Sequence, residues 1–180
     1  MDFDDPFESL WSIYQVTRDC HKVARKMVNR GDEHFLEGTE FIAGSKNDAA
    51  KSIEQSRKES EDFVIVSLWA TFERIIIGHL QTRGRKLLEE PPETLSSRLC
   101  EKFQNDVEYS RVDDILDLFK ETIDADLIGS AKNIKRHRDW IVHRNPNRPS
   151  PGKVTPVFSY EILLEIVLQI QKFLPYLNIQ

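Results

Sequence analysis

An arginine and a histidine five positions apart are the pair of residues in this chain best suited to chemistry. They stand in the stretch Arg138-Asp139-Trp140-Ile141-Val142-His143. A guanidinium offers a planar fork of donors to a phosphate, and an imidazole exchanges protons more readily near neutral pH than any other side chain. An aromatic ring between them adds a surface on which a base can stack. The combination favours contact with RNA.

The charge around this pair differs sharply from that of the remaining chain. Residues 132–153 hold seven basic residues and one acidic residue, a net charge of +6. The other residues hold 18 basic and 29 acidic ones, a net charge of −11, and the 180-residue chain sums to −5. The total excludes a broadly basic coat but leaves room for a narrow cationic cleft that binds phosphates. The alternative is that the basic run is only a solvated helix face.

Arg138 falls on the apolar face of the helix predicted over residues 126–143. On a helical wheel that face consists of Leu127, Ala131, Ile134 and Ile141, with Arg138 between the last two. A guanidinium directed at a core is costly unless it is paired or faces a cleft. One alternative is therefore a structural arginine that bridges two helices through a carboxylate such as Glu73.

His143 falls on a different face of the same helix, which it shares with Arg136, Asp139 and Trp140. We expect Asp139 to accept a hydrogen bond from the imidazole and so to fix its tautomer. On an ideal helix Arg138 and His143 lie about 140° apart, so they can flank one groove but cannot point in parallel. A two-fold partner that supplies the same pair would help to close such a site. The alternative is a solvated histidine at a helix C-terminus.

The elements that position these residues are all predicted to be helical. Asp5-Pro6-Phe7-Glu8 is a helix start, and Asn29-Arg30-Gly31 is a stop. Further helices are predicted over 34–42, from 47 or 48 to the stop formed by Gly84 and Pro91-Pro92, and over 93–109, 112–123, 126–143 and about 159–174. Only residues 154–158 suggest a strand. The sequence predicts one all-α domain over 1–180, a bundle of five to seven helices.

Composition excludes several other classes of protein. With 39% hydrophobic and 31% charged residues, the chain is typical of a soluble folded domain. Cys20 and Cys100 form no zinc motif and are expected to be reduced, the N-terminus is acidic, and the apolar stretch 63–80 is interrupted by charged residues. We expect a cytoplasmic protein without a membrane span. We also expect neither metal nor cofactor, because the sequence contains no metal-spaced cluster and no glycine-rich phosphate loop.

The stretch Arg136-His137-Arg138-Asp139-Trp140-Ile141-Val142-His143-Arg144 resembles the HEPN superfamily of bacterial toxin and phage-defence ribonucleases, in particular its RiboL-PSP group. The signature of that superfamily is an arginine, commonly followed by a polar residue, with a histidine four to six positions later in a late helix of an all-α bundle. The helix order resembles the family over most of the chain. The specific residues span about ten positions.

The resemblance implies a metal-independent endoribonuclease in which the RNA 2′-OH attacks the adjacent phosphate. His143 would be the general acid or base, Arg138 would stabilise the charge on phosphorus, and Asp139 would orient His143. The RNA contacts would come from the residues around them: Arg136, His137, Trp140, Arg144, Asn145 and Arg148. It also implies a homodimer with the site at the two-fold interface, and an antitoxin or defence-system protein as a partner.

Several alternatives stay open at the level of sequence. Arg136 also has a family-like spacing to His143, and Arg74 and His79 repeat the five-residue spacing in an apolar segment, where we interpret them as structural. Asn145 stands where some family members carry a tyrosine that a partner enzyme modifies, so that mode of control is not expected. The other functions considered are a non-catalytic bundle that binds RNA or a nucleotide, and a helical dimerisation or adaptor module that meets an acidic partner.

Overall fold

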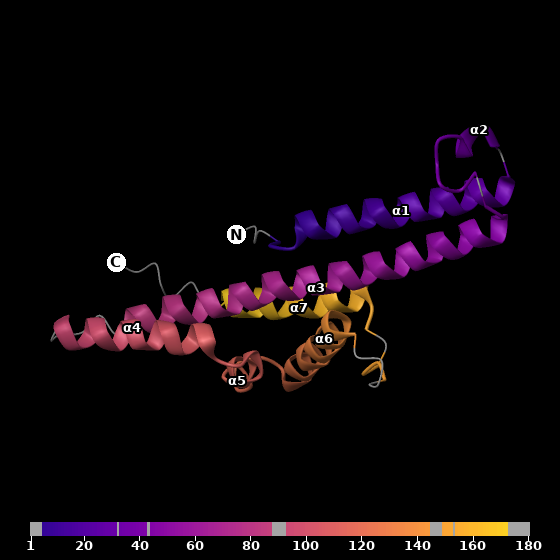
Figure 1. The fold of residues 1–180 in the computed structure, drawn as a ribbon. Coiled ribbons are helices and arrows are strands. Elements are labelled where there is room, and N and C mark those ends of the chain that lie inside the picture. The colour runs from indigo at the N-terminus through magenta and orange to yellow at the C-terminus, as the bar shows by residue number, and fades with distance from the viewer. Residues whose placement is uncertain are drawn as a thin grey trace.

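The protein is entirely helical over the part of the chain that the structure describes, which confirms the predicted all-α fold class and a number of helices between five and seven (Figure 1). The computed structural model describes residues 5–31, 33–42, 44–87, 93–144, 149–152 and 154–172. In these residues the helices are α1 (Glu8–Arg30), α2 (Glu33–Leu36), α3 (Lys46–Leu87), α4 (Glu93–Tyr109), α5 (Val112–Asp117), α6 (Ala125–His143) and α7 (Pro156–Lys172).

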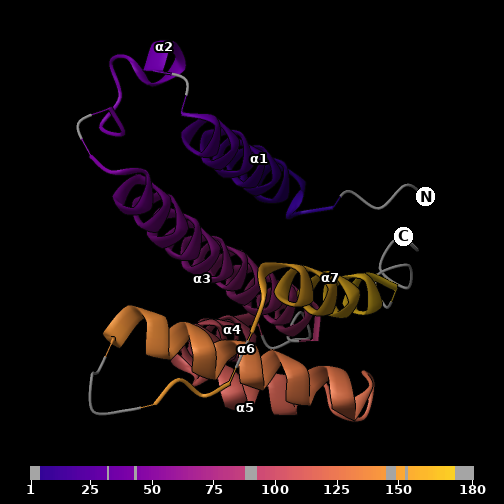
Figure 2. The same ribbon diagram turned by 90° about the vertical axis from the view of Figure 1, so that its right-hand side faces the viewer.

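Helix α3 is the central element and packs against five of the other helices. It is 42 residues long, and α1 lies along one end of it while α4, α6 and α7 pack along the other (Figures 1 and 2). Trp69, Phe72 and Ile76 on α3 are fully buried in the core that these helices enclose. By length and composition α3 would also suit a membrane span, and 39% of its most apolar window is buried. A central bundle helix meets the same criterion, so length and composition do not separate the two.

The ends of α1 follow the predicted start and stop signals. The Asp5 carboxylate accepts a hydrogen bond of 2.8 Å from the backbone N–H of Phe7, one residue before the helix begins. Gly31 at the other end has φ of 69°, and its N–H bonds to the carbonyls of Met27 and Val28. A left-handed residue is costly for any side chain with a Cβ, so glycine ends the helix here.

Four predicted boundaries differ from the structure. Gly84 does not end α3, which continues to Leu87; a Cβ on Gly84 would lie 1.9 Å from the Phe103 ring, so glycine allows α4 to approach. The predicted helix over 34–42 is only the single turn Glu33–Leu36, because Gly38 adopts φ of 75°. α5 ends at Asp117, six residues before the predicted end of that helix. Residues 154–158 form no strand, and α7 already begins at Pro156.

The molecule has two regions of different thickness. Residues 15–58, here called the arm, comprise most of α1, all of α2 and the start of α3, and they extend away from the other helices (Figures 1 and 2). The buried residues of the arm are Val28, Ala49 and Ile53. The remaining described residues, here called the body, enclose the main core. Phe7, directly before α1, and Tyr14, in the first turns of α1, belong to this core.

Candidate functional site

Helix α6 carries the predicted site residues and lies across α3 in the body. The Asp124 carboxylate caps its first turn by accepting a 2.8 Å hydrogen bond from the N–H of Asp126. Buried Ile134 and Ile141 on α6 face the core, as the apolar pattern predicts. The helix ends where Arg144 adopts φ of 36° and its N–H bonds to the Trp140 carbonyl. The packing of α6 on α3 therefore determines which groups contact each of the predicted site residues.

Arg138 forms a bridge from α6 to α3. Its Nη2 lies 3.0 Å from Oε2 of Glu73, and its Nη1 lies 2.9 Å from Oδ1 of Asp139. The guanidinium carbon is 5.7 Å from the centre of the Trp69 ring, and the Trp69 indole donates a 3.0 Å hydrogen bond to the same Glu73 oxygen. The Arg138 side chain keeps 24% of its surface exposed. This is the helix-bridging arginine named above as an alternative, and it is fixed in position with part of its surface open to solvent.

Asp139 does not form the expected hydrogen bond with His143. Its Oδ1 faces Arg138, and its Oδ2 accepts a 3.0 Å hydrogen bond from Nζ of Lys135. Both carboxylate oxygens are thus occupied by cations on its own helix, which are stronger partners than a neutral imidazole. His143, the last residue of α6, is exposed, and no described side chain forms a hydrogen bond with it.

His137, predicted from the sequence to contact RNA, is buried in the structure and is not exposed to solvent. Its side chain is 7% exposed, and its ring stacks on that of Trp140 at 5.9 Å between ring centres. Burial lowers the pKa of His137, while nearby Asp62 and the Gly152 backbone act in the opposite direction. Nδ1 of this imidazole is buried without a partner. His137 and Trp140 therefore help to anchor the end of α6 against the following loop.

Most cations of the basic segment lie beside carboxylates. Of the five that the structure describes in residues 132–153, four form ion pairs: Lys132 with Asp117, Lys135 with Asp113 and Asp139, Arg138 with Glu73 and Asp139, and Arg144 with Glu59 and Asp62. Exposed Arg136 hydrogen-bonds to the neutral side chain of Asn133. The separation of charge along the sequence is therefore much weaker in the folded protein.

Two acidic residues of α3 belong to the same region, although sequence reasoning missed them. Glu59 accepts a 2.9 Å hydrogen bond from Nη1 of Arg144, which holds the pKa of Glu59 below its usual range. Asp62 lies 3.7 Å from Arg144, and burial raises the pKa of Asp62. No signal in the sequence links positions so far apart; only the packing of α6 on α3 joins them.

Arg74 and His79, which repeat the spacing of the predicted site, have structural surroundings. Arg74 makes two hydrogen bonds to Glu108, at 2.9 and 2.8 Å, and so ties α3 to α4. His79 lies near the Phe119 ring, and burial lowers its pKa. These contacts agree with the structural interpretation of this pair. Predicted residues Asn145 and Arg148 lie outside the described residues.

No family model matches the chain, and no curated protein or solved structure is significantly similar to it. Membership of the HEPN superfamily therefore stays a prediction from the residues. Among the described residues, no three His, Cys, Asp or Glu side chains gather closely enough to hold a metal ion. The chemistry that the site offers rests on the positioned guanidinium of Arg138, the exposed imidazole of His143 five residues further along α6, and exposed Arg136.

Proposed function

We propose that this chain is a metal-independent endoribonuclease of the HEPN type, with Arg138 and His143 at its site. The observation that carries the proposal is the setting of Arg138, which Glu73, Asp139 and the Trp69 ring hold in one orientation while part of its surface stays exposed. A guanidinium has five N–H donors, so two ion pairs leave donors for a phosphate. A group that is already oriented needs no reorganisation when charge develops on the substrate.

The reaction follows from the nature of the two groups. The His143 imidazole takes the proton of the RNA 2′-OH, and the oxygen forms a bond to the adjacent phosphorus. The bond from phosphorus to the 5′ oxygen breaks, and the imidazolium so formed, or that of a second copy across a two-fold axis, returns a proton to the leaving oxygen. The products are a 2′,3′-cyclic phosphate and a 5′-OH end. DNA is spared, because it lacks the nucleophile.

The test is RNA cleavage in the presence of EDTA by the wild type, by His143→Ala and by His34→Ala. His34 is an exposed histidine of α2 and serves as the matched control. We expect His143→Ala to reduce cleavage by about 10²–10⁴-fold, with cyclic-phosphate ends in the wild-type product, and His34→Ala to leave it unchanged. The proposal is wrong if EDTA stops cleavage, or if His143→Ala cuts as fast as the wild type.

A second candidate, a non-catalytic helical interaction module, draws support from the ion pairs of the basic segment. Four of its five described cations are already paired with carboxylates, which leaves less positive charge to attract phosphates. This candidate predicts either no RNA affinity or binding without product. A cleavage assay under conditions that allow RNA binding separates the two candidates, because only the ribonuclease yields a product.

A further inference from the structure

Helix α1 carries an apolar stripe that is largely exposed to solvent. Its members alternate at spacings of three and four residues: Ile13, Val16, Cys20, Val23 and Met27. Ile13 and Val16 are each 62% exposed, Val23 is 54% exposed, and Cys20 is exposed as well. The face of α1 that packs on α3, which includes Tyr14 and Val28, lies well round the helix from this stripe. α1 therefore has two apolar faces: one packs on α3, and the other, the stripe, is exposed to solvent.

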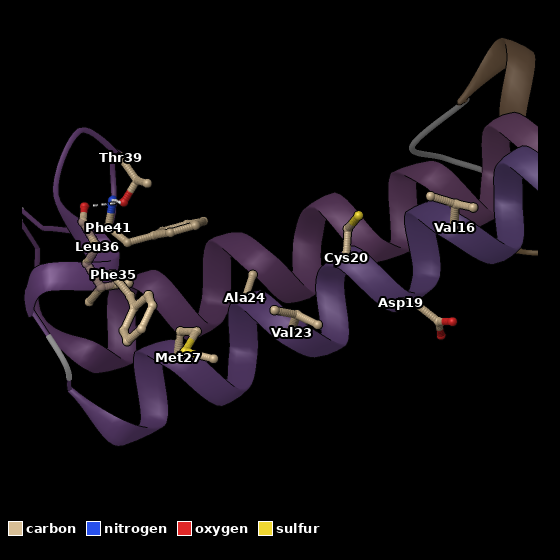
Figure 3. Close-up of a pocket in the computed structure, with 10 residues that line it drawn as sticks. All are labelled: Val16, Asp19, Cys20, Val23, Ala24, Met27, Phe35, Leu36, Thr39 and Phe41. Carbon is tan, nitrogen blue, oxygen red and sulfur yellow. Dashed lines mark hydrogen bonds between the residues drawn. The ribbon is translucent and has the colours of Figure 1, made fainter.

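The bare stripe forms the floor of an apolar groove of about 720 Å³ (Figure 3). At its far end, beside Met27, α2 supplies the ring of Phe35 and the loop after α2 supplies the ring of Phe41. The Thr39 hydroxyl shapes this loop by donating to the Leu36 carbonyl at 2.7 Å and accepting from the N–H of Phe41 at 3.3 Å. At the near end, Ile13 and exposed Phe63 of α3 continue the apolar surface.

A spacing of three and four residues is the pattern by which two helices pack side by side as a coiled coil. The arm is a two-helix hairpin with few buried residues of its own, and such a hairpin gains stability when a second hairpin covers its exposed apolar face. Two arms joined through their α1 helices would make a four-helix bundle. The spacing thus points to a helix as the occupant of the groove.

The charges beside the stripe fit a second copy of this chain running antiparallel. Asp19 and Lys26 flank the same edge of the stripe, seven residues apart, and one oxygen of Asp19 accepts a 2.9 Å hydrogen bond from Lys22 of the same helix. Consider an antiparallel pair of α1 helices in which Cys20 of one copy packs directly against Val23 of the other. The two-fold axis then places Asp19 of each copy beside Lys26 of the other, so this attraction between opposite charges occurs twice. A parallel pair would instead set Asp19 opposite Ala24 and Lys26 opposite Gly31, with no attraction gained.

We propose that the α1 stripe is a homodimer interface at which two copies of this chain pair antiparallel. In that arrangement the layers are Cys20 with Val23 and Val16 with Met27, each occurring twice. Ile13 of each copy comes to the groove end of the other, where Phe35 and Phe41 lie. The surface lies on the opposite side of α3 from α6 (Figures 1 and 2). It does not depend on the ribonuclease proposed above.

Sedimentation of purified full-length protein at a series of concentrations tests whether this surface joins the two copies. The wild type is expected to form a dimer, and Val16→Asp to weaken it by at least about 100-fold, because each dimer would bury two unpaired carboxylates. Gln15→Asp, exposed on the same helix outside the stripe, is the matched control and keeps the dimer. A wild-type monomer at all concentrations, or a dimer that Val16→Asp leaves intact, overturns the proposal. Circular dichroism verifies that each variant is folded.

Oxidative cross-linking in a Cys100→Ser background tests the orientation. Cys20 and an introduced Val23→Cys lie in one antiparallel layer, so this variant is expected to form covalent dimers, whereas Cys20 alone is not, because Cα atoms more than about 7 Å apart cannot be bridged. Adding Cys20→Ser should abolish the cross-link. Cross-linking through Cys20 alone, or through Val23→Cys after Cys20→Ser, indicates a parallel pair and contradicts the proposal.

Charge reversal checks the same arrangement independently. Asp19→Lys places two lysines together on both sides of the axis and is expected to weaken the dimer about tenfold at low salt. Adding Lys26→Asp restores opposite charges and should restore the dimer. If the double variant is as weak as the single one, Asp19 and Lys26 are not neighbours across the interface and the proposed register is wrong.

Discussion

Helices α1 and α6 have similar lengths, 23 and 19 residues, and both pack on α3. They differ in how far their side chains find partners within the chain. α6 places its apolar residues in the core and most of its cations beside carboxylates of α3 and α5, so both kinds of side chain find partners within the chain. α1 leaves an apolar stripe in solvent. Two helices that pack on the same central helix therefore differ: the charged face of α6 is paired within the chain, whereas an apolar face of α1 is exposed.

The largest expected effect comes from removing a core side chain of the body and comparing it with one of the arm. Trp69 is fully buried, and Trp69→Ala is expected to reduce the free energy of unfolding by about 3–5 kcal/mol. Val16→Ala, at a position that is 62% exposed, should change it by no more than about 0.5 kcal/mol in dilute monomer. Urea unfolding measures both. Similar losses for the two variants would show that the stripe is covered within one chain.

The next effect concerns the bridge between α6 and α3. Glu73→Gln removes one of the two carboxylates that hold Arg138 and is expected to cost about 1–2 kcal/mol, because both side chains are only partly exposed. The double variant Glu73→Leu with Arg138→Met should be less destabilised than the sum of the two single ones. A double-mutant cycle of unfolding free energies gives the coupling, and a coupling near zero would mean that the bridge does not stabilise the body.

A pH effect follows from the burial of His137. Burial lowers its pKa in the folded state below the ordinary value of 6.5, so the unfolded chain takes up a proton first as the pH falls. The contribution of neutral His137 to the free energy of unfolding is therefore fully present above about pH 6.5. It declines as the pH falls from there through the lowered pKa of the folded state. Thermal unfolding from pH 7.5 to 5 should show this decline. His137→Asn should reduce the slope, whereas His34→Ala, at an exposed site in the arm, should keep it.

The smallest expected effect is a difference between the labelling rates of the two cysteines, one in the arm and one in the body. Cys20 in the α1 stripe is exposed, whereas Cys100 in α4 is partly buried and accepts a hydrogen bond from Gln104. A thiol reagent should label Cys20 severalfold faster than Cys100 in dilute native protein. Labelling of Cys20 should slow as the protein concentration rises and dimers form. A Cys20 rate that is independent of concentration would place the dimer contact elsewhere.

Much of the fold could be predicted from local signals. The apolar periodicity of residues 93–109, the Asp5 start and the Gly31 stop specify helices whatever the surrounding structure, because caps and backbone conformations act over a few residues. The prediction failed at Gly84, where local propensity favours a break but the approach of Phe103 requires a residue without a Cβ. Periodicity also placed Arg138 on the buried face of its helix.

The sequence by itself determined which residues carry charge, which faces of the helices are apolar, and that Arg138 and His143 lie one turn and a half apart on a single helix. Only the tertiary structure decided what those groups meet. Packing on α3 brought Glu59, Asp62 and Glu73 beside the basic segment, and it left the α1 stripe exposed to solvent. The reason is physical: ion pairing and burial depend on distances in space, and contacts between residues far apart in the chain leave no trace in local spacing.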